Sequence, residues 1–324
     1  MPGRLRPSSL IGCANAPVGR HGFALLAVLW TVLGVAVLAL SAAVAARESV
    51  AATRNRANLT RAMWRAEDCL ERSRAAIADS LGLESTGGSE GSRTWRTLDV
   101  VVHQSPLVTA PACDVTVRAA GEAVDLNAVD GEQLRALLSV LAVPALCADS
   151  LADALLDWRD EDDLSRAHGA ERAWYGRNWR TLPRNGPLAD LRELNLVRGF
   201  ASVAGLERAA WVEPGRLAIN HAPLAVLATL PGVGEEALTR LAERRVRGEP
   251  VVSLTTLSAE LSPAAREQLG ARYADLVQLA TTEPDAWILT ARGTVGAPPM
   301  VAEIEVRLVR GGPRAAVVRR RVRA

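Results

Sequence analysis

The stretch FALLAVLWTVLGVAVLALSAAVAA, residues 23–46, decides how this 324-residue chain is organised. It includes no charged side chain, and a helix of that length, about 36 Å at 1.5 Å per residue, can cross the roughly 30 Å hydrocarbon core of a membrane. The residues that precede it are basic, at Arg4, Arg6, Arg20 and His21. Because positive charge is retained in the cytoplasm, we expect the short leader to stay there and the bulk of the chain to lie outside.

A cleaved secretory signal is a rival interpretation, because Ala43 to Ala45 read AVA, an A-x-A arrangement of small residues. The apolar region of such signals runs about 7–15 residues, however, and this one is longer. A helical pattern also continues beyond it, with residues three or four apart at Leu59, Met63, Ala66, Leu70, Ser73, Ile77 and Leu81. One helix is therefore predicted from Phe23 to about Leu81, whose amphipathic second half must pack on something beyond the membrane, as a plain anchor would not.

Strand signals follow a Gly/Ser-rich loop that is expected over residues 82–93. Segments rich in Val and Thr lie at residues 94–104, 113–126, 287–295 and 301–323. Turn-forming residues at 296–299 and 311–313 predict a meander of three short strands at the end. Because the two groups of strands flank a helical middle, we predict an α+β fold. Its small antiparallel sheet would come from residues 94–126 and 285–324, with a mostly helical domain, residues 127–284, inserted between the strands.

The expected insert contains a weak internal repeat. Asn127 and Asn220 each follow an apolar residue, and each is followed by Leu seven and ten residues later. Asparagine is favoured at the N-cap of a helix, where its side chain accepts a hydrogen bond from a first-turn amide. We therefore expect both asparagines to cap helices.

A dense acidic run lies in the insert, comprising Asp157, Asp160, Glu161, Asp162 and Asp163, with Glu171 eight residues further on. Carboxylates at this density repel one another unless they are solvated, paired with Arg or bridged by a cation. Oxygen ligands alone favour Ca²⁺, although the spacing is not that of an EF-hand. The residues by themselves leave a solvated, Arg-paired loop and a calcium site as alternatives.

An alternative function rests on LPGVG, residues 230–234. This motif resembles the turn with which helix-hairpin-helix modules bind phosphate through backbone amides. The element at 220–248 would then make the chain a membrane-anchored nucleic-acid-binding protein. Against this, Glu235 and Glu236 open the second helix where phosphate would sit, and the net charge of +2 gives no bulk attraction to nucleic acid. We therefore expect no nucleic-acid partner.

Catalysis finds little support in the sequence. A periplasmic hydrolase would have to use two neighbouring carboxylates as an acid/base pair, and only their proximity suggests it. No Ser or Cys lies in a nucleophile motif, so we expect no enzyme.

The four cysteines, Cys13, Cys69, Cys113 and Cys147, fit no metal-ligand spacing. If the leader is removed, three cysteines are left, which allow at most one internal disulfide of undetermined pairing.

The N-terminus resembles the type IV pilin and pseudopilin family. Its members carry a short basic leader ending in Gly, which a prepilin peptidase cuts before an apolar residue that opens a long helix. The resemblance implies that residues 1–22 are the leader, that Gly22 is its last residue, and that Phe23 is the mature, usually methylated, N-terminus. Most members carry Glu at the fifth mature position, where this chain has Ala27. The members that typically lack this Glu belong to the protein K family of the type II secretion system, the minor pseudopilins at the filament tip.

The insert carries the same resemblance. The stretches LLDWRDEDDLSRAHGAERAWYG, residues 155–176, and RNGPLADLRELNLVRG, residues 184–199, are similar to the protein K family, as is the element at Asn220. The resemblance implies a helix and loop over residues 23–93, with residues 23–46 in the membrane, a pilin-like sheet and a helical insert. It also implies a structural Ca²⁺ site at Asp160, Asp162, Asp163 and Glu171, with Asp157 as a further ligand.

The resemblance finally implies a location, partners and a function. The chain is expected to pass once through the bacterial inner membrane, with its C-terminal bulk in the periplasm. Its expected partners are the other minor pseudopilins in a tip complex, the major pseudopilin and the prepilin peptidase. Its expected function is to cap the pseudopilus tip and help to nucleate pseudopilus assembly, for protein export across the outer membrane.

Overall fold

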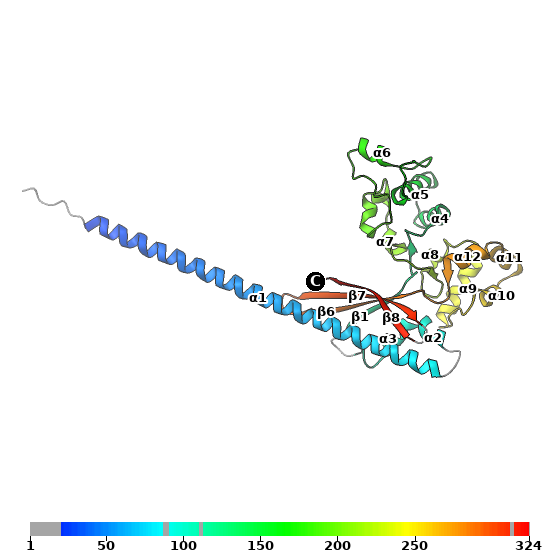
Figure 1. Ribbon diagram of the computed structural model, residues 1–324, viewed down its shortest axis with the longest axis horizontal. Coiled ribbons are helices and arrows are strands. Elements are labelled where there is room, and N and C mark those ends of the chain that lie inside the picture. The colour runs from blue at the N-terminus through cyan, green and yellow to red at the C-terminus, as the bar shows by residue number, and fades with distance from the viewer. Residues whose placement is uncertain (1–20, 87–90, 110–112, 312–313, 324) are drawn as a thin grey trace, which may run out of the picture. The chain divides into compact units, whose positions relative to one another are not determined.

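The computed structural model describes residues 21–86, 91–109, 113–311 and 314–323, and the chain divides into two compact units, Met1–Asn58 and Leu59–Ala324. Helix α1, His21–Thr86, is continuous and ends five residues beyond the predicted end (Figure 1). From Phe23 to Ala57 its side chains are exposed, and the helix is long and apolar enough to cross a membrane. The expected leader lies outside the described residues, except for its last two, which belong to α1.

The second unit contains a four-stranded antiparallel sheet in the order β1 (Asp114–Ala119), β6 (Trp287–Val295), β7 (Met300–Gly311) and β8 (Arg314–Arg323). The predicted C-terminal meander is therefore confirmed. Along β7, even-numbered residues such as Ile304 and Val306 are buried, while the residues between them are partly exposed. This period of two, which the sequence already displays, defines the face that covers the core.

The buried face of the sheet packs against the C-terminal half of α1. Leu70, Ile77 and Leu81 of the helix share one apolar core with Leu289 and Val306 of the sheet. The backbones come closest at Gly293, where an added Cβ would lie 1.9 Å from the carbonyl oxygen of Ala62. The amphipathic half of the predicted helix thus has the packing partner that its pattern required.

A disulfide joins α1 to the segment that leads into β1. It links Cys69 to Cys113 across 44 residues of sequence, whereas Cys147 is a free, exposed thiol in the insert. The sequence left this pairing open. The bond fastens the long helix to the first strand of the sheet.

The strand predicted over residues 94–104 is wrong, and so is the assignment of that segment to the sheet. Residues Gly91–Arg96 form α2 and Leu98–Gln104 form α3, which also shortens the loop expected over residues 82–93. Trp95, Leu98 and Val102 are the buried apolar residues, spaced three and four apart as on one face of a helix. Burial of this face against the sheet core outweighs the strand preference of the three valines.

The segment between β1 and β6 is mostly helical and has its own core, so the predicted α+β class with a helical insert is confirmed. Its helices are α4 (Gly131–Val140), α5 (Ala145–Arg159), α6 (Arg172–Arg177), α7 (Leu206–Ala209), α8 (Leu224–Leu227), α9 (Glu235–Val246), α10 (Leu254–Ala259), α11 (Pro263–Ala271) and α12 (Tyr273–Leu279). Two 3₁₀ turns, Leu191–Asn195 and Phe200–Ser202, lie between α6 and α7. Two small parallel sheets pair β2 (Val124–Asp125) with β3 (Ala210–Trp211), and β4 (Leu217–Ala218) with β5 (Ala280–Thr281).

The weak sequence repeat corresponds to a structural repeat. Each half begins with a two-residue strand, continues through a helical hairpin, α4–α5 or α8–α9, and returns to a parallel partner strand. An arginine at the end of each hairpin closes the half: Arg159 donates to the carbonyls of Leu126 and Val129, and Arg245 to those of Ile219 and Ala222. Burial lowers the pKa of both guanidinium groups.

The two repeat asparagines do not cap helices, which corrects that prediction. Asp130 caps α4, and the cap position of α8 is a proline without a side-chain hydrogen bond. Asn127 instead exchanges two hydrogen bonds with the backbone of Leu188, at 3.0 and 2.8 Å. Asn220 accepts from the amide of Val251 at 2.7 Å and donates to the carbonyls of Val251 and Thr282. Both side chains therefore hold distant loops onto the start of their repeat.

Asn220→Ala is expected to lower the free energy of unfolding by about 2–3 kcal/mol, because it removes three hydrogen bonds and leaves backbone groups unpaired. Urea titration of the detergent-solubilised chain measures the change. Asn178→Ala is the matched control, since Asn178 is exposed and its amide bonds only within its own helix turn, so a change within about 0.5 kcal/mol is expected. Equal losses in the two variants would contradict the role assigned to Asn220.

Candidate functional site

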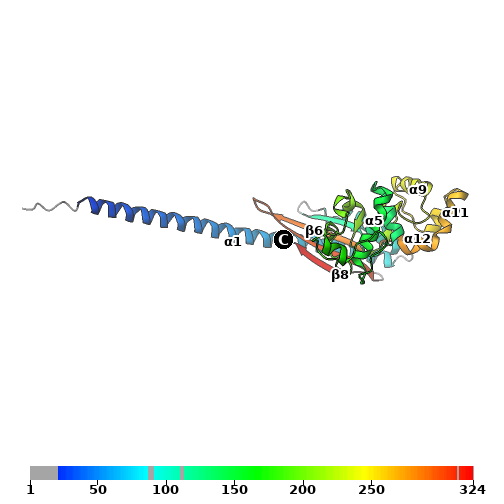
Figure 2. The same cartoon turned by 90° about the horizontal axis from the view of Figure 1, so that it is seen from above.

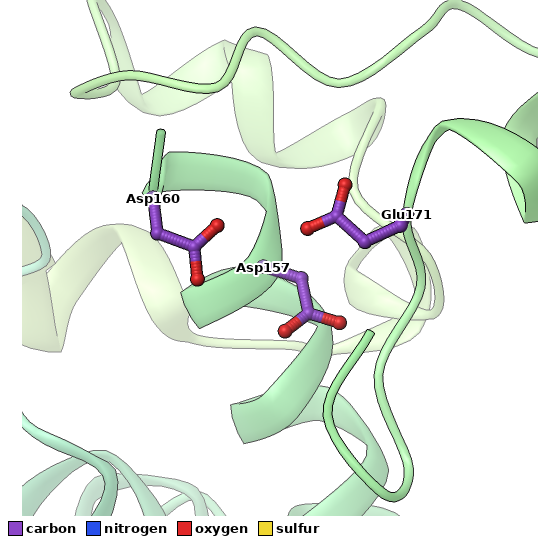
Figure 3. Close-up of side chains that lie close together, drawn as sticks. All are labelled: Asp157, Asp160 and Glu171. Carbon is purple, nitrogen blue, oxygen red and sulfur yellow. The ribbon is translucent and has the colours of Figure 1, made fainter. Parts of the chain in front are cut away.

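The acidic run lies where α5 ends and α6 begins. Asp157 occupies the last turn of α5 and is fully buried, Asp160 follows as the C-cap of α5, and Glu171 is the N-cap of α6 and is 3% exposed. Each contributes one carboxylate oxygen to a group in which all three oxygens lie within 4.8 Å of one another (Figure 3). Two helix ends thus direct three carboxylates to one point.

Aromatic packing fixes the two helix ends. Trp158 and Tyr175 are both buried and meet edge to face with their ring centroids 5.2 Å apart. The indole of Trp158 donates to Glu193 at 3.0 Å, and the hydroxyl of Tyr175 accepts from the amide of Arg198 at 3.0 Å. The site is therefore built on a rigid base between α5 and α6.

Arg166 is the single basic side chain that pairs with this group among the described residues. One of its Nη atoms contacts Asp157 Oδ1 at 2.6 Å and Asp160 Oδ2 at 2.5 Å, and its backbone amide also donates to Asp157. Gly169 lies against the same carboxylate, because an added Cβ would be 1.9 Å from Asp157 Oδ2. Neither Arg166 nor Gly169 was singled out from the sequence, since nothing local marks either residue.

One arginine does not satisfy three carboxylates. Asp160 Oδ1 and Glu171 Oε1 are buried and have no hydrogen-bond partner among the described residues. Burial, followed by the nearby charge of Asp157, raises the pKa of Glu171 to about 7. Two unpaired buried oxygens and a carboxyl with a raised pKa indicate a site short of positive charge.

The structure separates the sequence-predicted ligands into two groups. It brings together Asp157, Asp160 and Glu171 but not the other two aspartates. Asp162 accepts from the backbone amide of Leu164 at 2.7 Å, and Asp163 accepts from the side-chain amide of Asn185, beyond α6, at 3.0 Å. Both carboxylates are therefore hydrogen bonded away from the group.

The donor set suits a hard cation. All three side chains offer oxygen, the ligand that Ca²⁺ prefers, and water could complete its usual six to eight ligands. Asp160 Oδ1 and Glu171 Oε1 are the atoms that such an ion would satisfy. The residues present therefore fit Ca²⁺.

The hairpin turn of residues 230–234 packs against another helix of the insert. Gly232 adopts a left-handed φ of 77° and lies against α11, where an added Cβ would be 3.0 Å from the carbonyl oxygen of Gln268. Helices α9, α11 and α12 lie together in both views (Figures 1 and 2). Glu236 accepts two hydrogen bonds from Ser262, at 2.8 and 2.6 Å. The turn thus packs partly against α11, and the nucleic-acid alternative has no support.

Comparison with known proteins gives two findings. Residues 115–208, which include the whole acidic site, match the family described as type II secretion system (T2SS), protein K. Among solved structures, a chain of the GspK–GspI–GspJ complex from the type 2 secretion system of enterotoxigenic Escherichia coli is similar. Its identity is 19% and its TM-score 0.48, over 79% of this chain and 98% of that chain. No curated protein matches the sequence.

Proposed function

We propose that the chain is a minor pseudopilin of the type II secretion system, of the protein K family whose model matches residues 115–208, and that it caps the pseudopilus tip. There it would help to nucleate pseudopilus assembly for protein export across the outer membrane. The observation that carries the proposal is the matched domain in one chain with an apolar helix long enough to span a membrane. A structural role of this kind needs no catalytic residue, so no chemistry on a substrate is proposed.

The proposal gives each part of the chain a task. Residues 23–46 would anchor it in the inner membrane, and the bulk would lie in the periplasm. The second half of α1, which already packs on the sheet, would present its outer face to the helices of the other minor pseudopilins and of the major pseudopilin. The large insert between β1 and β6 favours the end of a filament, because a domain of that size beside the helix would obstruct the next subunit.

The position of the chain in the filament can be tested by labelling. An antibody against the insert, followed by electron microscopy of pseudopili, is expected to mark one end of each filament. Deletion of the chain is expected to reduce both the number of pseudopili and the export of secreted proteins. Label along the whole filament would contradict the capping role, and unchanged export in the deletion strain would contradict the function itself.

Processing is a separate part of the proposal. A prepilin peptidase would cut after Gly22 and leave Phe23 as a methylated N-terminus. The intact mass of the chain purified from its own membrane is expected to begin at Phe23, with or without one methyl group. A mass that begins near Arg47 would indicate a secretory signal instead, and an uncut chain a plain anchor.

Ala27→Glu tests the position at the tip. In a filament the usual Glu is thought to pair with the N-terminal amine of a neighbouring subunit, and a tip subunit would lack that neighbour. A carboxylate in an apolar bundle without a partner costs several kcal/mol, so we expect at least about tenfold fewer pseudopili, counted by microscopy. Ala27→Gln, uncharged and of similar size, is the control and should lose less. Normal assembly and export with Ala27→Glu would overturn this explanation of the alanine.

We further propose that Asp157, Asp160 and Glu171 hold a structural Ca²⁺ ion. When bound, the ion would supply the positive charge that the three carboxylates lack. Arg166, which contacts two of them, would balance part of their negative charge and keep Asp157 oriented. The support is the pair of buried, unpaired oxygens, Asp160 Oδ1 and Glu171 Oε1. The expected ligands Asp162 and Asp163 are left out of this set, because their carboxylates bond to Leu164 and Asn185 instead of joining the group.

A further inference from the structure

A groove of about 440 Å³ lies between the C-terminal half of α1 and strand β8. Its floor is apolar and includes Ile77 and Leu308, which belong to the core beneath the sheet. Ala78, an exposed residue of α1, lies beside them, and Arg74 and Arg314 line the groove as well. The groove therefore offers apolar surface together with two guanidinium groups.

The groove adjoins an unusual sheet edge. β8 is the end strand, so within the described residues one row of its backbone amide and carbonyl groups faces no further strand. Proteins usually protect such an edge with a very short strand, a proline or charge. β8 runs over ten residues and exposes Val317, Val318 and Val322 by 37%, 55% and 47%. Exposed valines on a long edge strand favour pairing with another strand.

A bulge in β8 separates the part of the edge beside the groove from the rest of the strand. The register of β8 against β7 shifts at Val318, which is skipped between the pairs of Val317 and Arg319. Such a bulge twists the strand and interrupts regular pairing. The bulge thus divides the edge into Arg314–Val317, beside the groove, and Arg319–Arg323, which carries four of the five arginines of the strand. Because charge protects the second stretch, the first is the one that a further strand could join.

Charge defines the occupant. β8 carries five arginines and no acidic residue. Of the four beyond the bulge, Arg319, Arg320 and Arg321 pair with glutamates of this chain. Among the described residues Arg314, at the groove, makes no ion pair, whereas Arg74 pairs with the exposed Glu71 at 2.6 Å. An incoming segment would meet the unpaired guanidinium of Arg314 at the groove, with that of Arg74 beside it, so acidic side chains would be favoured there.

We propose that the groove and the Arg314–Val317 edge of β8 bind an extended segment of a neighbouring pseudopilin, one that alternates acidic and apolar residues. Its backbone would continue the sheet beyond β8, its apolar side chains would pack on Ala78 and Ala315 above the buried floor, and its carboxylates would face Arg74 and Arg314. This inference rests on the proposed function, because it takes the partner from the same filament. It adds a sheet-edge contact to the helix contacts of α1.

A photo-crosslinking experiment tests the proposal in the full-length chain, coexpressed with the other pseudopilins of its own secretion system. A photoreactive benzoyl-phenylalanine replaces Ala78 in the groove. The control places it at Ala264, an exposed alanine of α11 in the insert that lines no part of the groove. The expected product is a crosslink from position 78, and not from 264, to a pseudopilin peptide with alternating acidic and apolar residues. The double variant Arg74→Glu with Arg314→Glu should lower its yield about tenfold, whereas Arg177→Glu, an exposed charge reversal in the insert, should leave it unchanged.

The outcomes separate this inference from the function on which it rests. Co-purification of other pseudopilins with the unaltered chain supports the function independently of the groove. If they co-purify but position 78 yields no crosslink, crosslinks only within this chain, or is insensitive to the double charge reversal, the groove proposal is overturned and the function stands. If no pseudopilin co-purifies, both fail. Thermal unfolding of the double variant, expected to match that of the unaltered chain, shows that a lost crosslink is not a loss of folding.

Discussion

Calcium at about 100 times its dissociation constant is expected to raise the melting temperature of the metal-stripped chain by about 5–10 °C. A ligand at that excess adds about 2.7 kcal/mol to the free energy of unfolding, and each kcal/mol shifts the melting temperature of a unit of this size by about 2–4 °C. The physical source is the group Asp157, Asp160 and Glu171, whose oxygens converge within 4.8 Å with one arginine to balance them. Differential scanning calorimetry with CaCl₂, MgCl₂ or EGTA measures the shift, and Mg²⁺ should produce less of it, because it demands stricter octahedral geometry.

Two single-site variants make the calcium test specific. Asp157→Asn is expected to abolish the shift, because it removes a charged ligand at the centre of the site. Asp163→Asn is the matched control, since this aspartate lies in the same loop but bonds to Asn185 instead of joining the group, so the shift should persist. No shift in the unaltered chain, or equal shifts in both variants, would contradict the site. Buried Asp157 also bonds to Arg166, so Asp157→Asn changes stability without calcium as well. The result is therefore the difference in melting temperature measured with and without calcium for each variant.

The same site predicts a pH dependence. In the metal-free chain the pKa of Glu171 is raised from 4.5 to about 7, so the folded protein holds a proton that the unfolded chain releases between these values. Stability without metal should therefore fall as the pH rises from about 4.5 to about 7 and then level off. Calcium must displace that proton below about pH 7, so its apparent affinity should weaken as the pH falls. Glu171→Gln, which cannot titrate, should lack both effects in calorimetric melts across this range.

The elements that could be predicted from the sequence are those whose pattern is local and repeated. The uncharged run of residues 23–46 and the three-and-four spacing after it specify α1, and strict alternation specifies β7. The strand predicted over residues 94–104 was wrong, because there the local pattern and the burial disagree. Their valines favour a strand, but the residues that the sheet core buries, Trp95, Leu98 and Val102, are spaced for a helix. Only the presence of that core decides between the two patterns.

The candidate site shows the same limit. Acidic density located the loop, but convergence depends on where two helices end, and so Asp157 and Glu171 meet while Asp162 and Asp163 do not. Arg166 could not be chosen from the sequence, because its role follows from the path of the chain between the two helices. The two repeat asparagines, Asn127 and Asn220, are the clearest case. Asparagine as a residue type predicts a helix cap a few residues away, whereas Asn127 bonds to Leu188, 61 residues further along the chain.

Removal of the disulfide is expected to produce the largest loss of stability, about 4 kcal/mol. The bond between Cys69 and Cys113 closes a loop across 44 residues, and a crosslink of that span restricts the unfolded chain by roughly this amount. Mutating both cysteines, Cys69→Ser with Cys113→Ser, removes the bond without leaving an unpaired thiol. Urea titration followed by tryptophan fluorescence measures the loss, because Trp95 and Trp287 are buried in the core that the bond adjoins.

Cys147→Ser provides the matched control, since that thiol is exposed and unbonded in the insert, and its unfolding midpoint should not move. Thiol alkylation of the processed, unreduced chain under denaturing conditions should modify one cysteine, Cys147, and three after reduction. If the double serine variant unfolds at the midpoint of the unaltered chain, the bond does not stabilise the junction between α1 and the sheet. If it is destabilised as expected, α1 depends on a covalent bond as well as on its apolar face. That dependence suits a helix which, in the proposed function, links a membrane anchor to a filament.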